Sequence, residues 1–159
     1  SSLINRVVER RGLARTSATP GKTASINFYR LDGMRMVDLP GYGFARRAKS
    51  DITKWSSLTE HYFVDNSALT YVLQLIDIRV GITDDDKMML SYLDHYDLPY
   101  IIVATKCDKL NKTQLNEACA KLLSSGLLRS NTEVILYSSL KGIGRETLWS
   151  KIIEMSIGE

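Results

Sequence analysis

The chain has 159 residues and carries 21 Lys and Arg against 18 Asp and Glu, a net charge of +3. Its length suits one domain around a single core, and 44% hydrophobic with 25% charged residues argues against wholesale disorder. No apolar run approaches the roughly 18 residues of a membrane-spanning helix, so we expect neither such a helix nor a signal peptide. Cys107 and Cys119 form no C-x-x-C pair, which excludes a disulfide scaffold or zinc site and fits a reducing cytosol.

The charge is distributed unevenly along the chain. Residues 1–50 carry ten basic and three acidic groups, whereas residues 51–159 carry eleven basic and fifteen acidic groups. A basic end on a nearly neutral protein is typical of a surface that faces a polyanion, so contact with nucleic acid is one interpretation. Arginines that merely solvate a helix and its loops are the other interpretation.

Strand and helix patterns alternate along the chain without an internal repeat. Residues 25–30 and 35–38 predict a hairpin whose strands are joined by Asp32-Gly33. Strands that suit a buried parallel sheet are predicted at 71–77, 100–105 and 133–137. Helices are predicted at 50–63, from the capping box at 83–86, at 113–123 with a stop at Ser125-Gly126, and at 146–155.

Strands separated by single helices indicate an α/β fold with right-handed crossovers. We expect a mixed, mostly parallel sheet with helices on both faces. In such sheets ligands bind beyond the carboxyl ends of the strands, so the segments that follow each strand are the place to look for chemistry.

Asp38-Leu-Pro-Gly41 follows the second strand of the hairpin. A carboxylate at a strand tip can hold a magnesium-bound water, and a glycine three residues later lets its N–H approach a phosphate. The D-x-x-G pattern is weak by itself, because chance produces it often.

Thr105-Lys-Cys-Asp108 follows the most hydrophobic strand and is more specific. An aspartate in this position can accept hydrogen bonds from the N1 and N2 donors of guanine, while the alkyl chain of Lys106 covers the ring. Adenine lacks this donor pair, and sites built on such pairing discriminate by as much as ~10⁴. A surface turn with a helix cap is the alternative interpretation.

Two further segments carry a weaker pattern. Ser138-Ser-Leu-Lys-Gly142 follows the last strand, and its small residues leave backbone N–H groups free for a guanine O6, although Ser and Gly also favour ordinary turns. Residues 16–23 form a polar loop with Pro20, where a hydroxyl can bind Mg²⁺ when a γ-phosphate draws the loop in. Gly21-Lys22-Thr23 resembles the end of a phosphate loop, but it follows no strand.

Taken together these segments resemble the guanine-nucleotide-binding domain of translation-factor-type GTPases. Four motifs of the chain resemble those of the EngB family (also called YihA or YsxC), bacterial ribosome-biogenesis GTP-binding proteins: Leu13–Thr23, Val37–Gly43, Asp77-Ile-Arg79 and Thr105–Lys109. The resemblance runs from Ser1 to about Lys151. It implies a Ras-like P-loop GTPase fold and a single EngB-type G domain over 1–159.

The resemblance also implies roles for individual residues. Thr23 would bind Mg²⁺ in the first switch and, with Gly41, take part in catalysis, while Asp38 would hold the metal indirectly. Lys106 and Asp108 would read guanine, and 137–139 would close over its O6. The implied GTP or GDP contacts are Ser1, Ser2, Gly21, Lys22, Thr23, Ala24, Ser25, Asp38, Leu39, Pro40, Gly41, Thr105, Lys106, Cys107, Asp108, Tyr137, Ser138 and Ser139.

The chain departs from the family pattern at its start. The G-x-x-x-x-G-K-S phosphate loop and the strand before it are absent, and Ser1 aligns with the magnesium-binding serine that ends this loop. We therefore expect that an N-terminal segment precedes Ser1. After Gly41 comes Tyr42, where Ras-like proteins place a glutamine that orients water, so we expect slow intrinsic hydrolysis, on the order of 4 × 10⁻⁴ s⁻¹ as in Ras.

The function that the resemblance implies is a GTP-driven switch in assembly of the large (50S) ribosomal subunit, needed for normal cell division. The protein would be a cytoplasmic monomer whose basic segment faces rRNA; this segment comprises Arg6, Arg10, Arg11, Arg15, Arg46 and Arg47. The alternative is a nucleotide-gated module that binds a partner protein without RNA, through Trp55, Phe63 and residues 43–47. An ATP-using enzyme conflicts with Asp108.

Overall fold

A computed structural model of the protein describes residues 2–7, 26–31, 33–42, 59–64 and 66–157. The chain divides into two compact units, Ser1–Leu69 and Thr70–Glu159, and each is described by itself. Among the described residues, no helix combines the length and apolarity that a membrane crossing requires.

The first unit contains the predicted hairpin. Strand β1 (Asn27–Leu31) pairs antiparallel with β2 (Met34–Asp38), and the register runs from Leu31 opposite Met34 to Asn27 opposite Asp38. The hairpin prediction is therefore confirmed, while Asp32 of its predicted connection lies outside the described residues. This unit also holds helix α1 (Ser2–Val7), and residues 59–64 are the described part of the helix predicted at 50–63.

Aromatic side chains connect the hairpin to the helical residues 59–64. The Phe28 and Tyr62 ring centroids lie 6.2 Å apart, and those of Tyr62 and Phe63 lie 5.8 Å apart. Phe63 is only 5% exposed, so it belongs to the core. The prediction that Phe63 contributes to a protein-binding surface is wrong for this reason, and Trp55 and residues 43–47 lie outside the described residues.

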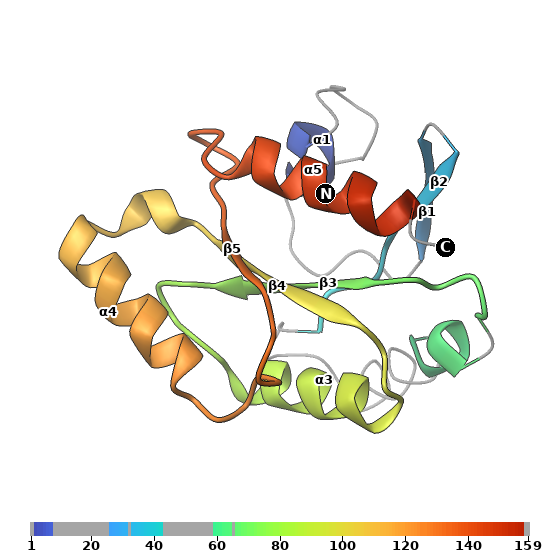
Figure 1. Ribbon diagram of the computed structural model, residues 1–159, viewed down its shortest axis with the longest axis horizontal. Helices are drawn as coiled ribbons and strands as arrows, with labels where there is room; N and C mark the ends of the chain where they lie inside the picture. The colour runs from blue at the N-terminus through green and yellow to red at the C-terminus, as the bar shows by residue number, and fades with distance from the viewer. Residues whose placement is uncertain (1, 8–25, 32, 43–58, 65, 158–159) are drawn as a thin grey trace. The chain divides into compact units, whose positions relative to one another are not determined.

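The second unit is a parallel sheet with the order β3-β4-β5. Its strands are β3 (Val72–Asp77), β4 (Tyr100–Thr105) and β5 (Val134–Leu136), and its long helices are α3 (Asp84–His95), α4 (Lys112–Leu123) and α5 (Arg145–Ile157). Figure 1 shows α3 on one side of the sheet and α5 on the other. The α/β architecture and the parallel pairing are confirmed, but the described strands form two sheets, because the hairpin pairs only with itself.

Burial follows the position of each strand. Strand β4 lies between β3 and β5, and five of its six residues are buried, which explains its nearly continuous apolar sequence. Strand β3 is not buried throughout as predicted: Leu75 is 45% exposed, whereas Gln74 is buried and donates to Asp86 of α3 at 3.5 Å. Successive side chains of a strand point to opposite faces, so the face of β3 that carries Gln74 and Ile76 is the more buried one.

Helix starts are set by side-chain caps. Thr83 and Asp86 form the predicted capping box of α3, in which the Asp86 N–H donates to Thr83 Oγ1 and the Thr83 N–H donates to Asp86 Oδ2. Helix α4 begins one residue earlier than predicted, because Asn111 and Gln114 form a second capping box.

Two contacts fix the edges of this unit. Gly144 has φ of +72°, and a Cβ there would lie 1.9 Å from the carbonyl oxygen of Leu136, so the start of α5 lies directly against the end of β5. Near the start of β4, Arg129 donates to the carbonyls of Leu93 and Leu98 at 3.0 and 3.1 Å and pairs with Asp94 at 2.6 Å. Arg129 thereby closes the end of α3.

Candidate functional site

The carboxyl ends of β3 and β4 are held in register. Asp77 lies opposite Thr105, the Ile78 N–H donates to the Thr105 carbonyl at 3.1 Å, and Thr105 Oγ1 donates to the Ile76 carbonyl at 3.2 Å. Thr105 therefore hydrogen-bonds the ends of β3 and β4 to each other. The residues that follow each strand, Asp77 to Arg79 and Lys106 to Asp108, meet at this edge of the sheet.

A left-handed residue turns the chain at the end of β4. Lys106 has φ of +59°, and a short 3₁₀ turn, η1 (Cys107–Lys109), follows it. The Cys107 N–H donates to the Tyr137 carbonyl at 3.3 Å, while the Tyr137 N–H donates to the Ala104 carbonyl at 2.9 Å. These two bonds place Asp108 beside the segment that follows β5.

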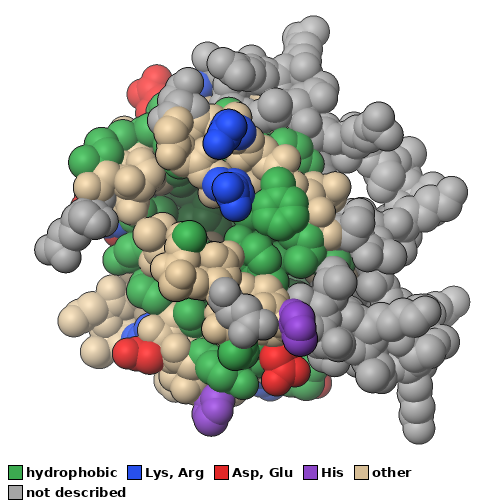
Figure 2. All heavy atoms as spheres, turned by 90° about the vertical axis from the view of Figure 1, so that its right-hand side faces the viewer, with side chains coloured by type: hydrophobic (Ala, Val, Ile, Leu, Met, Phe, Trp, Pro, Cys, Tyr) green, Lys and Arg blue, Asp and Glu red, His purple; other side chains and the backbone are tan. Residues whose placement is uncertain are grey.

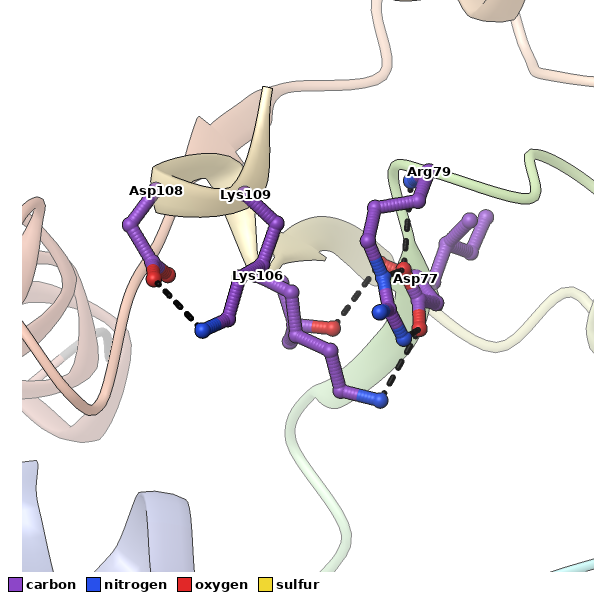
Figure 3. A network of polar contacts seen from close by, with 7 residues as sticks. Asp77, Arg79, Lys106, Asp108 and Lys109 are labelled. Carbon is purple, nitrogen blue, oxygen red and sulfur yellow. Dashed lines mark hydrogen bonds and ion pairs between the residues drawn. The ribbon is translucent and has the colours of Figure 1, made fainter. Parts of the chain in front are cut away.

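Asp108 lies in the turn after β4, beside the segment that follows β5, and its side chain is only 7% exposed. Ser138 is its main stabilising partner: hydrogen bonding by the Ser138 side chain lowers the Asp108 pKa, and the charges of Lys109 and Lys141 act in the same direction against partial burial. The Lys109 ammonium lies 3.8 Å from the carboxylate (Figure 3). Asp108 is therefore a carboxylate at neutral pH.

The orientation of the Ser138 hydroxyl follows from its other bond. Its oxygen accepts the Lys141 N–H at 3.0 Å, so its own proton is available for Asp108. A hydroxyl that donates to a carboxylate leaves the remaining lone pairs of that carboxylate for a ligand with paired N–H groups. The arrangement can thus recognise a purine edge that carries two donors.

The loop after β5 is more tightly bonded than the sequence suggested. The Ser138 N–H donates to the Ile143 carbonyl at 3.0 Å, and the Gly142 N–H donates to the Ser138 carbonyl at 2.8 Å. Ser138 therefore has no spare N–H, which corrects part of the expectation for this loop. In the described part of the chain, the N–H groups of Ser139 and Leu140 have no acceptor, so they are the donors this loop can offer a ligand.

Tyr137 is placed differently from the expectation that it would close over the base. It is fully buried, and its N–H and carbonyl both bond to the β4 side of the sheet. Its contribution is to hold the two loops together. Cys107 is likewise buried, and burial raises the pKa of its thiol.

Asp77 is the residue at this edge that sequence reasoning named only as part of a motif. Its carboxylate accepts from Arg79 Nε at 2.9 Å, from Arg79 Nη2 at 2.6 Å and from Lys106 Nζ at 2.9 Å. Figure 3 shows Asp77 between these two cationic side chains. The hydrogen bonds from Arg79, followed by that from Lys106, hold the pKa of Asp77 well below its usual range, against partial desolvation.

The first unit contains the other described site residues. Asp38 ends β2 as the sequence predicted, and its charge adds to burial in raising the pKa of Tyr29 on the neighbouring strand. After it Leu39 is half-buried, Pro40 is buried and Gly41 is exposed. Gly41 therefore presents its backbone at the surface of this unit.

Several predicted residues lie outside the described part of the chain. These are Ser1, the loop residues Gly21, Lys22, Thr23, Ala24 and Ser25, and Arg10, Arg11, Arg15, Arg46 and Arg47 of the basic segment. Ser2 is the first residue of α1, which also carries Arg6. No group of three or more His, Cys, Asp or Glu side chains with metal-binding placement occurs among the described residues.

Comparison with known proteins agrees with this geometry. The family model described as 50S ribosome-binding GTPase matches residues 1–106. The probable GTP-binding protein EngB of Geobacter sulfurreducens is 41% identical over 96% of this chain and 74% of its own length. The protein of the same name from Geobacillus thermodenitrificans is 41% identical over 96% of this chain and 79% of its own length.

Solved structures show the same fold. The crystal structure of a probable GTP-binding protein engB matches with a TM-score of 0.75 and 21% identity, over 98% of this chain and 91% of that one. A structure of Era in complex with MgGDPNP and a segment of 16S ribosomal RNA matches with a TM-score of 0.72 and 18% identity, over 98% of this chain and 52% of that one. The family match and the identity over most of the relatives' length show that this chain belongs to the EngB family of GTP-binding proteins and is a GTPase of that family.

Proposed function

We propose that this protein is a guanine-specific switch that binds GTP and GDP at the edge of the sheet formed by the ends of β3, β4 and β5, and that it acts in assembly of the large ribosomal subunit. The observation that carries the nucleotide assignment is the state of Asp108. It is a nearly buried carboxylate whose pKa is lowered by Ser138 and whose position is fixed by the bond between Cys107 and Tyr137.

Each neighbour of Asp108 has a part in this proposal. The carboxylate accepts the N1 and N2 donors of guanine, the stem of Lys106 covers one face of the ring, and the Ser139 N–H donates to O6. Because adenine carries a donor where guanine carries O6 and lacks the N2 donor, it would leave the carboxylate and this N–H poorly paired. Such unpaired buried groups are the basis of strong discrimination.

The phosphates and Mg²⁺ are assigned from the family. In the proposal Gly41 meets the γ-phosphate, Ser1 and Thr23 provide hydroxyl ligands for Mg²⁺, and Asp38 acts through a bound water. Magnesium keeps several waters and takes few protein ligands when it binds nucleotide phosphates, so a dedicated carboxylate cage is not needed. The position of Asp38 at the tip of β2 fits such a role.

Hydrolysis in this proposal is slow without a partner. Tyr42 follows Gly41, and a phenol provides neither the carbonyl nor the amide with which the glutamine of Ras-like proteins orients water. A partner that completes the site would then accelerate the reaction and couple hydrolysis to release from the ribosome.

The ribosomal partner rests on the family and on charge. Residues 1–50 carry the excess of basic groups, and most of the basic segment lies outside the described residues. Figure 2 shows one face of the molecule, on which the described Lys and Arg side chains are few and stand among hydrophobic ones. In the proposal the RNA contact is made by the arginines of the basic segment. From family membership we also propose a cytoplasmic monomer with a role in cell division.

Nucleotide specificity is tested with Asp108→Asn in the full-length protein. The amide offers one donor where the carboxylate offered only acceptors, so preference should move from guanine to xanthine nucleotides. Calorimetry with GDP, XDP and ADP measures the change, and Asp84→Asn, an equal charge change at the exposed start of α3, is the matched control. An unaltered protein that binds ADP as tightly as GDP would refute the assignment.

The ribosomal assignment is tested by co-sedimentation with large subunits in GTP, GDP and no nucleotide, at two salt concentrations. Binding through phosphate contacts should weaken steeply with salt and should be lost after RNase treatment. Binding that ignores salt, RNase and nucleotide would instead favour the protein-binding alternative.

A further inference from the structure

The Asp77-Ile78-Arg79 segment has no role in the guanine contacts just proposed, yet it forms the densest ion network at this edge (Figure 3). Two of the three guanidinium nitrogens of Arg79 donate to Asp77, Nη2 at 2.6 Å and Nε at 2.9 Å, and the backbone N–H of Arg79 donates to the same carboxylate at 3.1 Å. Lys106 completes the network at 2.9 Å.

The Asp77 carboxylate is a fixed point rather than a mobile surface charge. It lies at the end of β3 in register with Thr105, its side chain is 23% exposed, and four hydrogen bonds from two residues reach it. Planar two-point pairing with an arginine restricts the orientation of a carboxylate as well as its position. The Lys106 ammonium therefore binds to a preset acceptor.

This anchor constrains the part of Lys106 that matters for a base. The left-handed backbone of Lys106 sets one end of its side chain, and Asp77 holds the other end. The four-carbon stem is thereby stretched between two fixed points, although the side chain is 54% exposed. A free lysine carries considerable rotamer entropy, and ordering it before the ligand arrives removes that cost from binding.

We propose that Asp77, held by Arg79, is a positioning residue that fixes the stem of Lys106 against the guanine ring. The inference rests on the proposed guanine site. In this inference Asp77 makes no contact with the nucleotide and acts only through the Lys106 ammonium, which it holds at 2.9 Å. Lys106 then serves the nucleotide through its apolar stem and not through its charge.

A double-mutant cycle with Asp77→Asn and Lys106→Met tests this coupling in the full-length protein. Methionine keeps an unbranched apolar stem but has no ammonium for Asp77 to hold. We expect Asp77→Asn to raise the dissociation rate of a fluorescent GDP by about two- to fivefold, the range of one partly exposed ion pair. In the Lys106→Met background the same change should alter the rate by less than about 1.5-fold.

The sign of the effect separates positioning from simple electrostatics. Removing a negative charge near a nucleotide favours binding of its anionic phosphates, so long-range electrostatics alone predicts slower dissociation for Asp77→Asn. Faster dissociation that disappears with Lys106→Met is expected only if Asp77 acts through the ammonium. Arg79→Met should shift the rate in the same direction, and it serves as the second variant should Asp77→Asn fail to fold.

Other results would overturn the inference. Equal acceleration in both backgrounds, together with a matching fall in Tm, would make Asp77 a purely structural residue, and slower or unchanged dissociation would remove its positioning role. Asp84→Asn breaks the exposed Lys87–Asp84 pair of the same 2.9 Å length and should leave the rate unchanged. Failure of the guanine site itself would show separately, as loss of the preference for GDP over ADP in the unaltered protein.

Discussion

Replacing Gly144 with alanine should damage both the fold and the candidate site. Gly144 has φ of +72°, and the added Cβ would lie 1.9 Å from the Leu136 carbonyl oxygen, a separation that real side chains do not reach. The obstacle is backbone at the end of β5, so it cannot move aside as a flexible side chain would. Leu136 lies two residues before Ser138, and its displacement would carry Ser138 away from Asp108.

Gly126 is a matched control, because its φ is +71° but a Cβ there would meet nothing within 4 Å. Both substitutions place alanine in the left-handed region, at a cost of about 1–2 kcal/mol. Only Gly144→Ala adds a steric overlap, which costs about 1–3 kcal/mol in a packed interior. The two variants should therefore differ by about 1–3 kcal/mol, or about 2–12 °C in Tm.

Urea and thermal unfolding of both variants measure the difference, and GDP affinity measured in parallel reports on the site. We expect Gly144→Ala to have the lower Tm and the weaker affinity, with Gly126→Ala close to the unaltered protein in affinity. Equal losses of unfolding free energy in the two variants would refute the argument, because backbone conformation alone would then explain both.

Two further predictions concern charged residues of the second unit. Arg129→Met should lower the free energy of unfolding, measured in urea, by about 1–3 kcal/mol, because it leaves the Leu93 and Leu98 carbonyls without this donor. The control Lys87→Met, which removes an exposed ion pair, should cost less than about 0.5 kcal/mol. Equal effects of the two changes would contradict the role of Arg129. The lowered pKa of Asp77 stabilises the fold above about pH 4, and this contribution is lost as the pH falls toward the folded pKa. Between about pH 5 and pH 3, the free energy of unfolding should therefore fall more for the unaltered protein than for Asp77→Asn. Equal falls in the two proteins would count against this role of Asp77.

Elements whose rules are local could be predicted from the sequence. The Asp32-Gly33 pattern predicted the hairpin that β1 and β2 form, the Thr83–Asp86 spacing starts α3, and the unbroken apolar run of β4 places it in the middle of the parallel sheet. Each of these features depends on residues within a few positions of one another. The capping box of Asn111 and Gln114 obeys the same rule, and the N-x-x-Q spacing was sufficient to find it.

Contacts between segments far apart in the chain could not be predicted from the sequence pattern. Lys106 reaches Asp77 across 29 positions and Arg129 reaches Asp94 across 35, and no periodicity encodes either partnership. The use of the Ser138 N–H within its own loop depends on the return of the chain at Ile143. For the candidate site, the sequence therefore indicated which strand ends to examine, whereas three-dimensional proximity revealed how their residues support one another.

The left-handed lysine that ends β4 has a consequence for sequence variation. At φ of +59° glycine or asparagine would adopt the backbone of Lys106 with less strain, because glycine has no Cβ to clash with the backbone and the short side chain of asparagine can hydrogen-bond locally. Either replacement would also remove the alkyl chain that stretches to Asp77. Selection for thermal stability therefore favours glycine or asparagine at this position, whereas selection for ligand specificity favours lysine. A library of variants selected only for thermal stability would lose the lysine.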